Sequence, residues 1–307
     1  MNVPPSCQNY QERAIQFPCL GVSLLGIICE PRSTLVRHPT AVLIIVGGPQ
    51  YRAGSHRQFT LLARSLAENG ITSLRMDYRG MGDSDGSPHT FEEVSDDVKS
   101  AIDALCQNTQ GPIERLVLWG LCDGASAALL YCQTKADPRV QGLVLLNPWV
   151  RSGHSLAKTH IKHYYLQRLK QPAFWKKFLS GGVAVSALTD LFTTARTAFG
   201  GKSSQTNANA KHNAWHAETL AQSTAPFQDR MALAWRHFSG QILLLTSGKD
   251  LTAQEFLDHA KVTPAWKNLL DRTSVRKIDI ADADHTFSNA RHRAEVETYT
   301  AEFVQSV

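Results

Sequence analysis

The segment 120–124, Gly-Leu-Cys-Asp-Gly, is where residue types and their spacing first point to chemistry. It fits the nucleophile-elbow pattern G-x-S-x-G, with Cys122 at the serine position. A nucleophile on a sharp strand-to-helix turn requires small residues two places before and two places after it, which Gly120 and Gly124 provide. A helix that begins beside Cys122 would point backbone N–H groups at the sulfur and favour the thiolate. The alternative interpretation is a buried free cysteine that happens to lie between glycines.

A cysteine nucleophile needs a base, and the base needs an acid that orients it. In sites of this kind the chain order is nucleophile, acid, histidine. His285 follows the last expected strand, at 275–280. Asp250 ends the turn that follows the preceding strand, at 242–246. Asp282 and Asp284 lie nearer to His285 in the sequence and stay open as alternative acids. The sequence therefore predicts a triad of Cys122, Asp250 and His285.

An oxyanion hole needs backbone N–H donors close to the reacting carbonyl. The residue after the nucleophile, Asp123, supplies one N–H, and the turn 47–50 (Gly-Gly-Pro-Gln) supplies the other. Pro49 has no N–H and cannot serve as the donor. The segment 46–49 (Val-Gly-Gly-Pro) resembles the H-G-G-P turn of certain peptidases, and this resemblance implies Gly48 as the donor, with Gln50 next. Val46 stands at the histidine position, so other contacts must hold the turn. An ordinary glycine turn is the alternative.

Other motifs give no reason to expect a cofactor, a metal or a nucleic acid. The segment 79–86 is a near miss to G-x-G-x-x-G, but the next helix is expected only near Thr90, so its N-terminus cannot be aimed at a pyrophosphate. Basic residues interleaved with aromatic ones fit an amphipathic helix better than a nucleic-acid surface. Two histidine pairs could share helical faces as metal ligands, but neither has an identifiable third ligand: His160 with His163, and His212 with His216.

Alternating strands and helices must position these residues. After two short strands within 17–30, broken by Gly21 and Gly26, we expect strands at 41–46, 72–77, 115–119, 140–146, 242–246 and 275–280. Helices are expected at 55–69, 90–107, 123–134, 253–270 and 288–304, the first capped by Ser55 with Gln58 and the second by Thr90 with Glu93. This order predicts an α/β fold with a mostly parallel sheet, helices on both faces and an antiparallel edge formed by the opening strands.

The alternation stops between 151 and 240, where apolar residues recur at helical spacing. We interpret 1–150 with 241–307 as the core and 151–240 as a helical lid inserted between two late strands. Residues 151–200 carry eight basic residues against one acid, Asp190. This charge indicates either a solvated amphipathic surface or recruitment of an anionic substrate, an acidic polymer or a membrane face.

Composition sets the broad class. Apolar residues make up 43% and charged residues 19% of the 307, which excludes a disordered, collagen-like or coiled-coil protein. No apolar run reaches the roughly 18 residues of a membrane span, and residues 1–19 lack the pattern of a signal peptide. The six cysteines include no CxxC pair, which is typical of reduced thiols. We therefore expect a cytoplasmic protein with no transmembrane segment.

The elbow, the turns that end in Asp250 and His285, and the segment 77–84 together resemble the α/β-hydrolase fold across nearly the whole chain. More narrowly, the segments 47–59, 121–129, 163–169 and 174–177 resemble the type-one exosortase A-associated hydrolases. Members of that family accompany exopolysaccharide and protein-sorting systems in Gram-negative bacteria, and their substrate is not defined. The resemblance implies components of such systems as partners and adds no reaction.

We expect a thiol hydrolase that cleaves an ester or thioester through an acyl-enzyme, with no cofactor. Acyl transfer to a hydroxyl stays open, because the Cys122 elbow also resembles that of polyhydroxyalkanoate synthases. A third hypothesis is a non-catalytic scaffold that retains the fold and binds a polysaccharide or a partner protein. The complete apparent triad argues against the scaffold.

Overall fold

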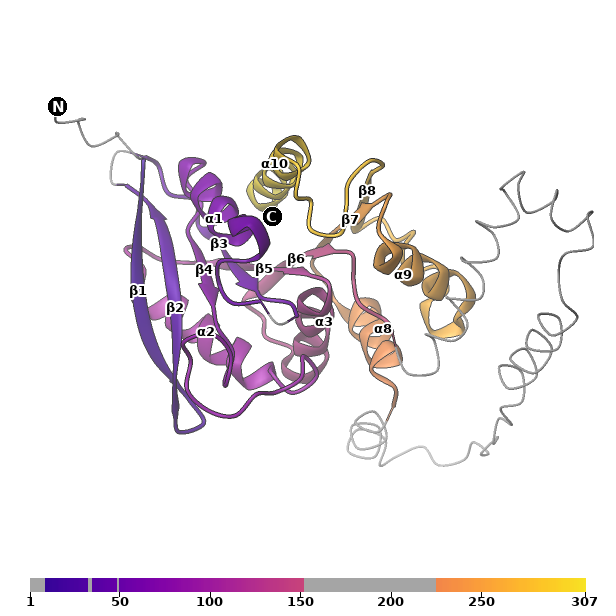
Figure 1. Cartoon of the computed structure of the whole chain (residues 1–307), viewed down its shortest axis with the longest axis horizontal. Coiled ribbons are helices and arrows are strands. Elements are labelled where there is room, and N and C mark those ends of the chain that lie inside the picture. Colours follow the sequence, from indigo (N-terminus) through magenta and orange to yellow (C-terminus); the bar gives the residue numbers. More distant parts are fainter. Residues whose placement is uncertain (1–8, 33–34, 49, 152–224) are drawn as a thin grey trace, which may run out of the picture. The chain divides into compact units, whose positions relative to one another are not determined.

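The computed structural model describes residues 9–32, 35–48, 50–151 and 225–307 (Figure 1). By its internal contacts the chain divides into one unit of residues 1–150 with 222–307 and a second unit of residues 151–221. Most of the segment predicted to form the lid, residues 152–224, lies outside the described residues.

An eight-stranded sheet forms the centre of this unit, in the order β1-β2-β4-β3-β5-β6-β7-β8. Only β2 runs against its neighbours, and every other described pairing is parallel. The strands are β1 (Tyr10–Cys19), β2 (Val22–Pro31), β3 (Thr40–Ile45), β4 (Ser73–Met76), β5 (Arg115–Leu121), β6 (Val140–Leu146), β7 (Gln241–Ser247) and β8 (Val275–Ile280).

The opening hairpin is longer than predicted. β1 begins at Tyr10, and Gly26 does not break β2 but pairs with Ile15 on one side and Met76 on the other. A Cβ at position 26 would lie 2.8 Å from the Leu74 side chain, so the glycine is a place of close packing rather than a strand end.

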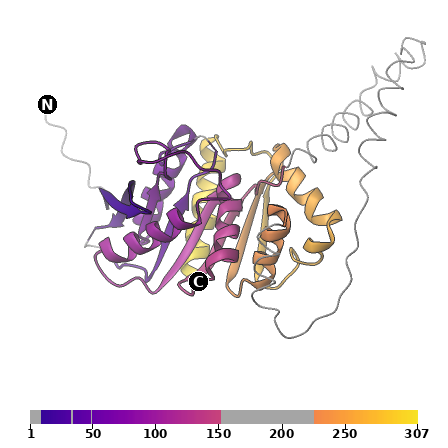
Figure 2. The same cartoon turned by 90° about the horizontal axis from the view of Figure 1, so that it is seen from below.

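Helices cover both faces of the sheet, as Figures 1 and 2 show. Apolar side chains of α1 (Gln58–Glu68) and α10 (Ala290–Ser306) pack in one buried cluster against one face. Those of α2 (Ser95–Asn108), α3 (Asp123–Lys135), α8 (Phe227–His237) and α9 (Leu251–Val262) pack in the cluster on the other face. The central strand β3 is buried along its whole length, as expected for a parallel strand covered on both sides.

The predicted start of α1 is wrong. A short 3-10 turn occupies Ser55–Arg57, and α1 begins at Gln58, after Arg57 in a left-handed conformation without a side-chain cap. The Ser55 N–H instead donates to Oε1 of Gln50, 3.0 Å away, so no capping box with Gln58 forms. At the next helix the Thr90 N–H and hydroxyl both bond to the Glu93 carboxylate, but α2 starts only at Ser95.

The predicted end of the insertion at residue 240 is also corrected. Helix α8 packs against α3, and its Trp235 is fully buried in an aromatic cluster with Phe256 and Trp266. Trp235 therefore belongs to the core of the first unit, and α8 is not part of the insertion.

Helix α9 ends at Val262 rather than near 270. Pro264 disfavours helical geometry in the residue before it and opens a 3-10 turn, η2 (Pro264–Trp266).

Candidate active site

Cys122 lies at the apex of a sharp turn between β5 and α3, with φ 60° and ψ −124°. Positive φ at a non-glycine residue is strained, and such strain gathers at functional sites. The flanking glycines permit the close approach of strand and helix. A Cβ on Gly120 would lie 2.4 Å from the carbonyl of Gly124, and a Cβ on Gly124 would lie 2.5 Å from the carbonyl oxygen of Ile45. The spacing of the elbow thus reflects two backbone contacts.

Hydrogen bonds from the segment after β6 hold this turn. The Cys122 N–H donates to the Leu146 carbonyl at 2.8 Å, and the Trp149 N–H reaches the Cys122 carbonyl at 3.2 Å. The Ser126 hydroxyl in α3 donates to the Trp149 carbonyl at 2.8 Å. The elbow is therefore tied to the end of β6 and to the segment that follows it.

Asp250 and His285 meet at the carboxyl ends of β7 and β8. Nδ1 of His285 lies 2.9 Å from Oδ2 of Asp250. The Asp250 carboxylate is also the N-cap of α9, where it accepts from the N–H groups of Thr252 and Ala253. Burial alone would raise the pKa of Asp250, but the bonds from His285 and these N–H groups bring it below its usual value. The carboxylate is thus kept ionised and fixed in direction.

His285 also bonds to the Cys122 side chain. Because Nδ1 is taken by Asp250, Nε2 is the ring nitrogen left for the sulfur. The Asp250 bond, followed by the Cys122 bond, raises the pKa of His285 to about 10 against the opposing effect of burial. At neutral pH the imidazole is accordingly an imidazolium beside the Asp250 carboxylate. The structure brings together the three side chains predicted as a triad.

The alternative acids are engaged elsewhere. Asp282 is exposed and pairs with Lys249 at 3.1 Å. Asp284 accepts the Ser288 N–H at 2.9 Å and also binds its hydroxyl. Proximity in sequence to His285 did not bring either carboxylate to its ring.

Sequence reasoning missed Asn147, the first residue after β6. Its side chain is fully buried, and its φ of 44° lies in the left-handed region that asparagine tolerates. Nδ2 donates to the Ser247 hydroxyl at 2.5 Å and to the His285 carbonyl at 3.1 Å, while Oδ1 accepts the Ser247 N–H at 2.9 Å. Asn147 therefore joins the strand that leads to Asp250 with the loop that carries His285. The only signal in the sequence was a polar residue directly after a buried strand.

The predicted oxyanion donors lie at the elbow, but a carboxylate already accepts a hydrogen bond from one of them. The Gly48 N–H donates to Oδ1 of Asp123 at 2.5 Å, with Gly48 at φ 63°. The prediction used only the backbone of Asp123 and overlooked its carboxylate. Burial raises the pKa of Asp123, and hydrogen bonds from the N–H groups of Gly48, Asp123 and Gly124 oppose that rise.

Tyr78 supplies the contact that holds the Gly47-Gly48 turn where Val46 replaces a histidine. Its hydroxyl donates to the Val46 carbonyl at 2.8 Å. Tyr78 is buried, and burial raises its pKa well above the usual value, so the hydroxyl stays a donor.

A cavity of about 330 Å³ opens over these residues. Its lining comprises Gly47, Gly48, Gln50, Leu121, Cys122, Asp123, Trp149 and His285. The predicted nucleophile, base and oxyanion donors thus share one cavity, large enough for a small acyl group.

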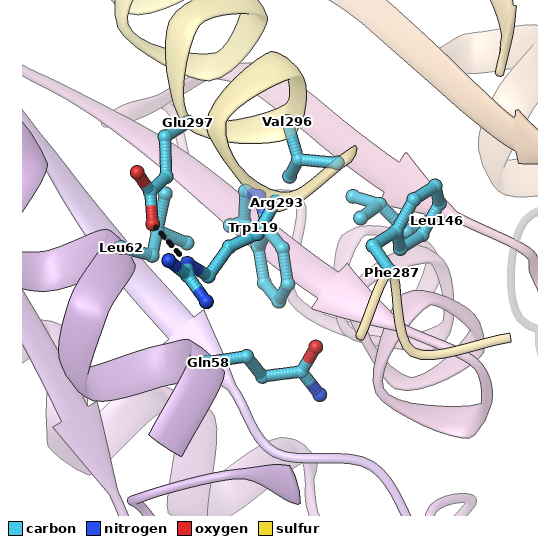
Figure 3. Close-up of a pocket in the computed structure, with 8 residues that line it drawn as sticks. All are labelled: Gln58, Leu62, Trp119, Leu146, Phe287, Arg293, Val296 and Glu297. Atoms are coloured by element: carbon cyan, nitrogen blue, oxygen red, sulfur yellow. Dashed lines mark ion pairs between the residues drawn. The ribbon is translucent and has the colours of Figure 1, made fainter. Parts of the chain in front are cut away.

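A second cavity, between α1 and α10, is too small to compete as a substrate site. Its volume of about 10 Å³ leaves room for about one water molecule. Figure 3 shows Arg293 and Glu297 pointing toward each other, 3.4 Å apart, beside Gln58 and Trp119.

In the ranges that the structure describes, no three His, Cys, Asp or Glu side chains form a group that could hold a metal ion. Among the same residues, no helix has the length and apolar character to cross a membrane.

Comparison with known proteins gives a family match. The sequence profile of the family described as serine aminopeptidase, S33, matches residues 37–251, well over half of the chain. The segment includes the elbow and ends just after Asp250.

Solved structures share the fold at low sequence identity. An esterase of Pyrococcus furiosus, Pf2001, has 15% identity and a TM-score of 0.59 over 100% of this chain and 96% of that one. Est1E of Butyrivibrio proteoclasticus, solved with ferulic acid, has 17% identity and a TM-score of 0.55 over 95% and 97%. GrgF of Penicillium sp. sh18 has 17% identity and a TM-score of 0.59 over 97% and 100%. The α/β-hydrolase fold is confirmed.

Two curated proteins match over shorter stretches. The polyketide transferase grgF of Penicillium is 31% identical over 94 residues, which are 30% of this chain and 31% of that protein. ABHD12B of Homo sapiens is 31% identical over 146 residues, 44% of this chain and 38% of that protein. The matches thus span less than half the length of either relative.

Proposed function

This chain belongs to the serine aminopeptidase S33 family of hydrolases, and from its site we propose a thiol-dependent hydrolase of carboxylic esters or thioesters. The observation that supports the proposal is the chain of contacts from Asp250 through His285 to Cys122 at the floor of one cavity. The structural likeness to esterases agrees with this reaction class.

Acylation starts from the Cys122 thiolate beside the His285 imidazolium. The sulfur attacks the acyl carbonyl carbon, a C–S bond forms, and the carbonyl oxygen becomes an oxyanion that the N–H groups of Gly48 and Asp123 stabilise. The oxyanion collapses, the bond to the leaving group breaks, and His285 gives its proton to the leaving oxygen or sulfur. The product is an acyl-Cys122 thioester with a neutral His285.

Deacylation uses the same histidine as a base. Neutral His285, oriented by Asp250, takes a proton from water as the water oxygen attacks the thioester carbonyl. The second tetrahedral intermediate expels the Cys122 thiolate, the acid product leaves, and the proton stays on His285. The free enzyme is restored.

Acyl transfer is the second candidate, favoured by the match to a protein named as a polyketide transferase. In that reaction a hydroxyl replaces water in deacylation, and the residues keep their roles. A non-catalytic scaffold is less consistent with the ordered triad.

The remaining expectations belong to the same proposal. We place the enzyme in the cytoplasm, with components of an exosortase or exopolysaccharide system as partners, on the resemblance of segments 47–59 and 121–129. The basic residues of 151–200 support an anionic substrate, such as a phosphate-bearing acyl carrier or an acidic saccharide ester.

A screen of p-nitrophenyl esters and acyl-CoA thioesters, followed by intact mass of the protein, tests the proposal. We expect turnover and an acyl adduct that is lost in Cys122→Ala. Product analysis with and without an alcohol or sugar acceptor separates hydrolysis from transfer. Turnover that survives in Cys122→Ala, or failure of a thiol-reactive activity probe to label Cys122, would contradict the thiol mechanism.

A further inference from the structure

The Asp123 carboxylate is bound to the Gly48 N–H, which the proposed mechanism assigns to the substrate's oxyanion. Oδ1 lies 2.5 Å from the Gly48 nitrogen and accepts its N–H. The N–H groups of Asp123 and Gly124 also bond to this carboxylate. The turn is built around it, since a Cβ on Gly47 would lie 2.5 Å from the same oxygen. The carboxylate is thus an intramolecular mimic of the oxyanion.

An acyl carbonyl cannot share these donors with the carboxylate. A backbone N–H has one hydrogen, and a bond as short as that from Gly48 leaves no space for a second acceptor. The side chain of Asp123 must therefore move before Cys122 can attack with the oxyanion stabilised.

Moving the carboxylate has a free-energy cost. It loses N–H partners in a site where burial already disfavours its charge. Neighbouring titratable groups give limited compensation. The Tyr78 hydroxyl is engaged with Val46, and His285, which attracts the carboxylate, is engaged with Asp250 and Cys122. A substrate that offers the carboxylate a new partner lowers this cost and displaces Asp123 more readily.

We propose that Asp123 determines specificity by favouring acyl groups that carry a hydrogen-bond donor, a hydroxyl or an ammonium, close to the carbonyl. The carbonyl oxygen takes the N–H groups of Gly48 and Asp123, and the displaced carboxylate accepts from the donor on the substrate. This inference rests on the proposed thiol hydrolase and deepens it. An acyl group without a hydrogen-bond donor displaces the Asp123 carboxylate poorly. An acyl group with a donor gives the displaced carboxylate a new hydrogen bond in place of the one from Gly48.

The test compares p-nitrophenyl esters of butyrate, 3-hydroxybutyrate and 3-aminobutyrate, with each rate divided by that of uncatalysed hydrolysis. The proteins are the wild type, Asp123→Ala and Asp123→Asn, with Asp282→Asn as a control that removes an exposed carboxylate. Asp123→Asn keeps the size of the side chain and guards against misfolding in Asp123→Ala. The hydroxyl and ammonium substrates distinguish the two kinds of donor.

In the wild type and Asp282→Asn, we expect kcat/KM to be at least about tenfold higher for a donor-bearing ester than for butyrate. In Asp123→Ala, kcat/KM for butyrate should rise by about tenfold, because the donors become free, and the preference should fall to within about threefold. Asp123→Asn should lie between the two, since a neutral amide competes less well for the N–H groups.

Two results would overturn the inference. One is an equal preference in the wild type and both Asp123 variants. The other is turnover of butyrate by Asp123→Ala that is no higher than that of the wild type, because the carboxylate would then not be what withholds the N–H donors. Failure of the proposed function looks different, since no protein would then form an acyl adduct on Cys122 with any ester.

Discussion

Nδ2 of Asn147 donates to the backbone carbonyl of His285 across 3.1 Å, joining the end of β6 to the loop after β8. The same amide group holds Ser247 through both its oxygen and its nitrogen. Asn147 does not itself line the cavity, so it acts on the chemistry through the direction of the histidine.

Asn147→Ala should lower kcat about a hundredfold, with KM little changed, because the misplaced base costs more in the reacting complex than in binding. It should also lower the free energy of unfolding by about 1–3 kcal/mol, since buried groups on Ser247 and His285 lose their partner. Steady-state kinetics and urea unfolding check both. A purely structural residue would lower stability and leave kcat per folded molecule unchanged.

Cys122 should be alkylated first by limiting iodoacetamide. It bonds to His285 in an open cavity, whereas burial raises the pKa of Cys29 and Cys132 to about 12 and keeps them as thiols. Burial also raises the pKa of Cys106. Peptide mapping measures the order of labelling. Faster labelling of Cys106 or Cys132 would be incompatible with Cys122 as the nucleophile.

Asp250→Asn should lower the rate by up to about four orders of magnitude, the loss expected when a triad histidine loses its carboxylate. The loss is expected to be smaller here, because in the proposed mechanism a thiolate at Cys122 also attracts the imidazolium. Asp282→Asn, which removes an exposed carboxylate paired with Lys249, should be neutral. If Asp250→Asn were neutral while Asp282→Asn or Asp284→Asn was inactive, the acid would be wrongly identified.

The raised pKa of His285, about 10, also predicts how stability depends on pH. A group whose pKa rises on folding contributes stability that is fully present below its unfolded-state pKa, near 6.5. That contribution is then lost as the pH rises through about 10. Urea unfolding of the wild type and His285→Gln should therefore differ most near pH 6, and the difference should shrink toward pH 10. A difference that grows between pH 6 and pH 10 would contradict a protonated His285 in the folded protein.

The order of the elements was predictable because buried parallel strands are continuous apolar runs, and the expected bounds of β6 agree with those observed. The bounds of β8 also agree, although this edge strand is only partly buried. The site was predictable where backbone sterics restrict residue type, as at Gly120 and Gly124. Long-range side-chain partners were not. No local pattern shows that Trp235 belongs to the core or that the Asp123 carboxylate reaches Gly48.

Gly124→Ala tests the close backbone contact at the elbow, because the free energy of unfolding should change in opposite directions with and without that contact. Gly124 lies in the first turn of α3, where helix propensity alone predicts that alanine stabilises by up to about 1 kcal/mol. The new Cβ would lie 2.5 Å from the Ile45 carbonyl oxygen and 3.1 Å from the Val46 carbonyl carbon, and backbone atoms cannot swing aside as a flexible side chain does. We expect the free energy of unfolding to fall by about 2–4 kcal/mol. Activity per folded molecule should fall as well, because β3 leads directly into the turn that carries Gly48. Urea unfolding together with kinetics measures both effects, and a Gly124→Ala protein more stable than the wild type would show that helix and strand are not in backbone contact at this position.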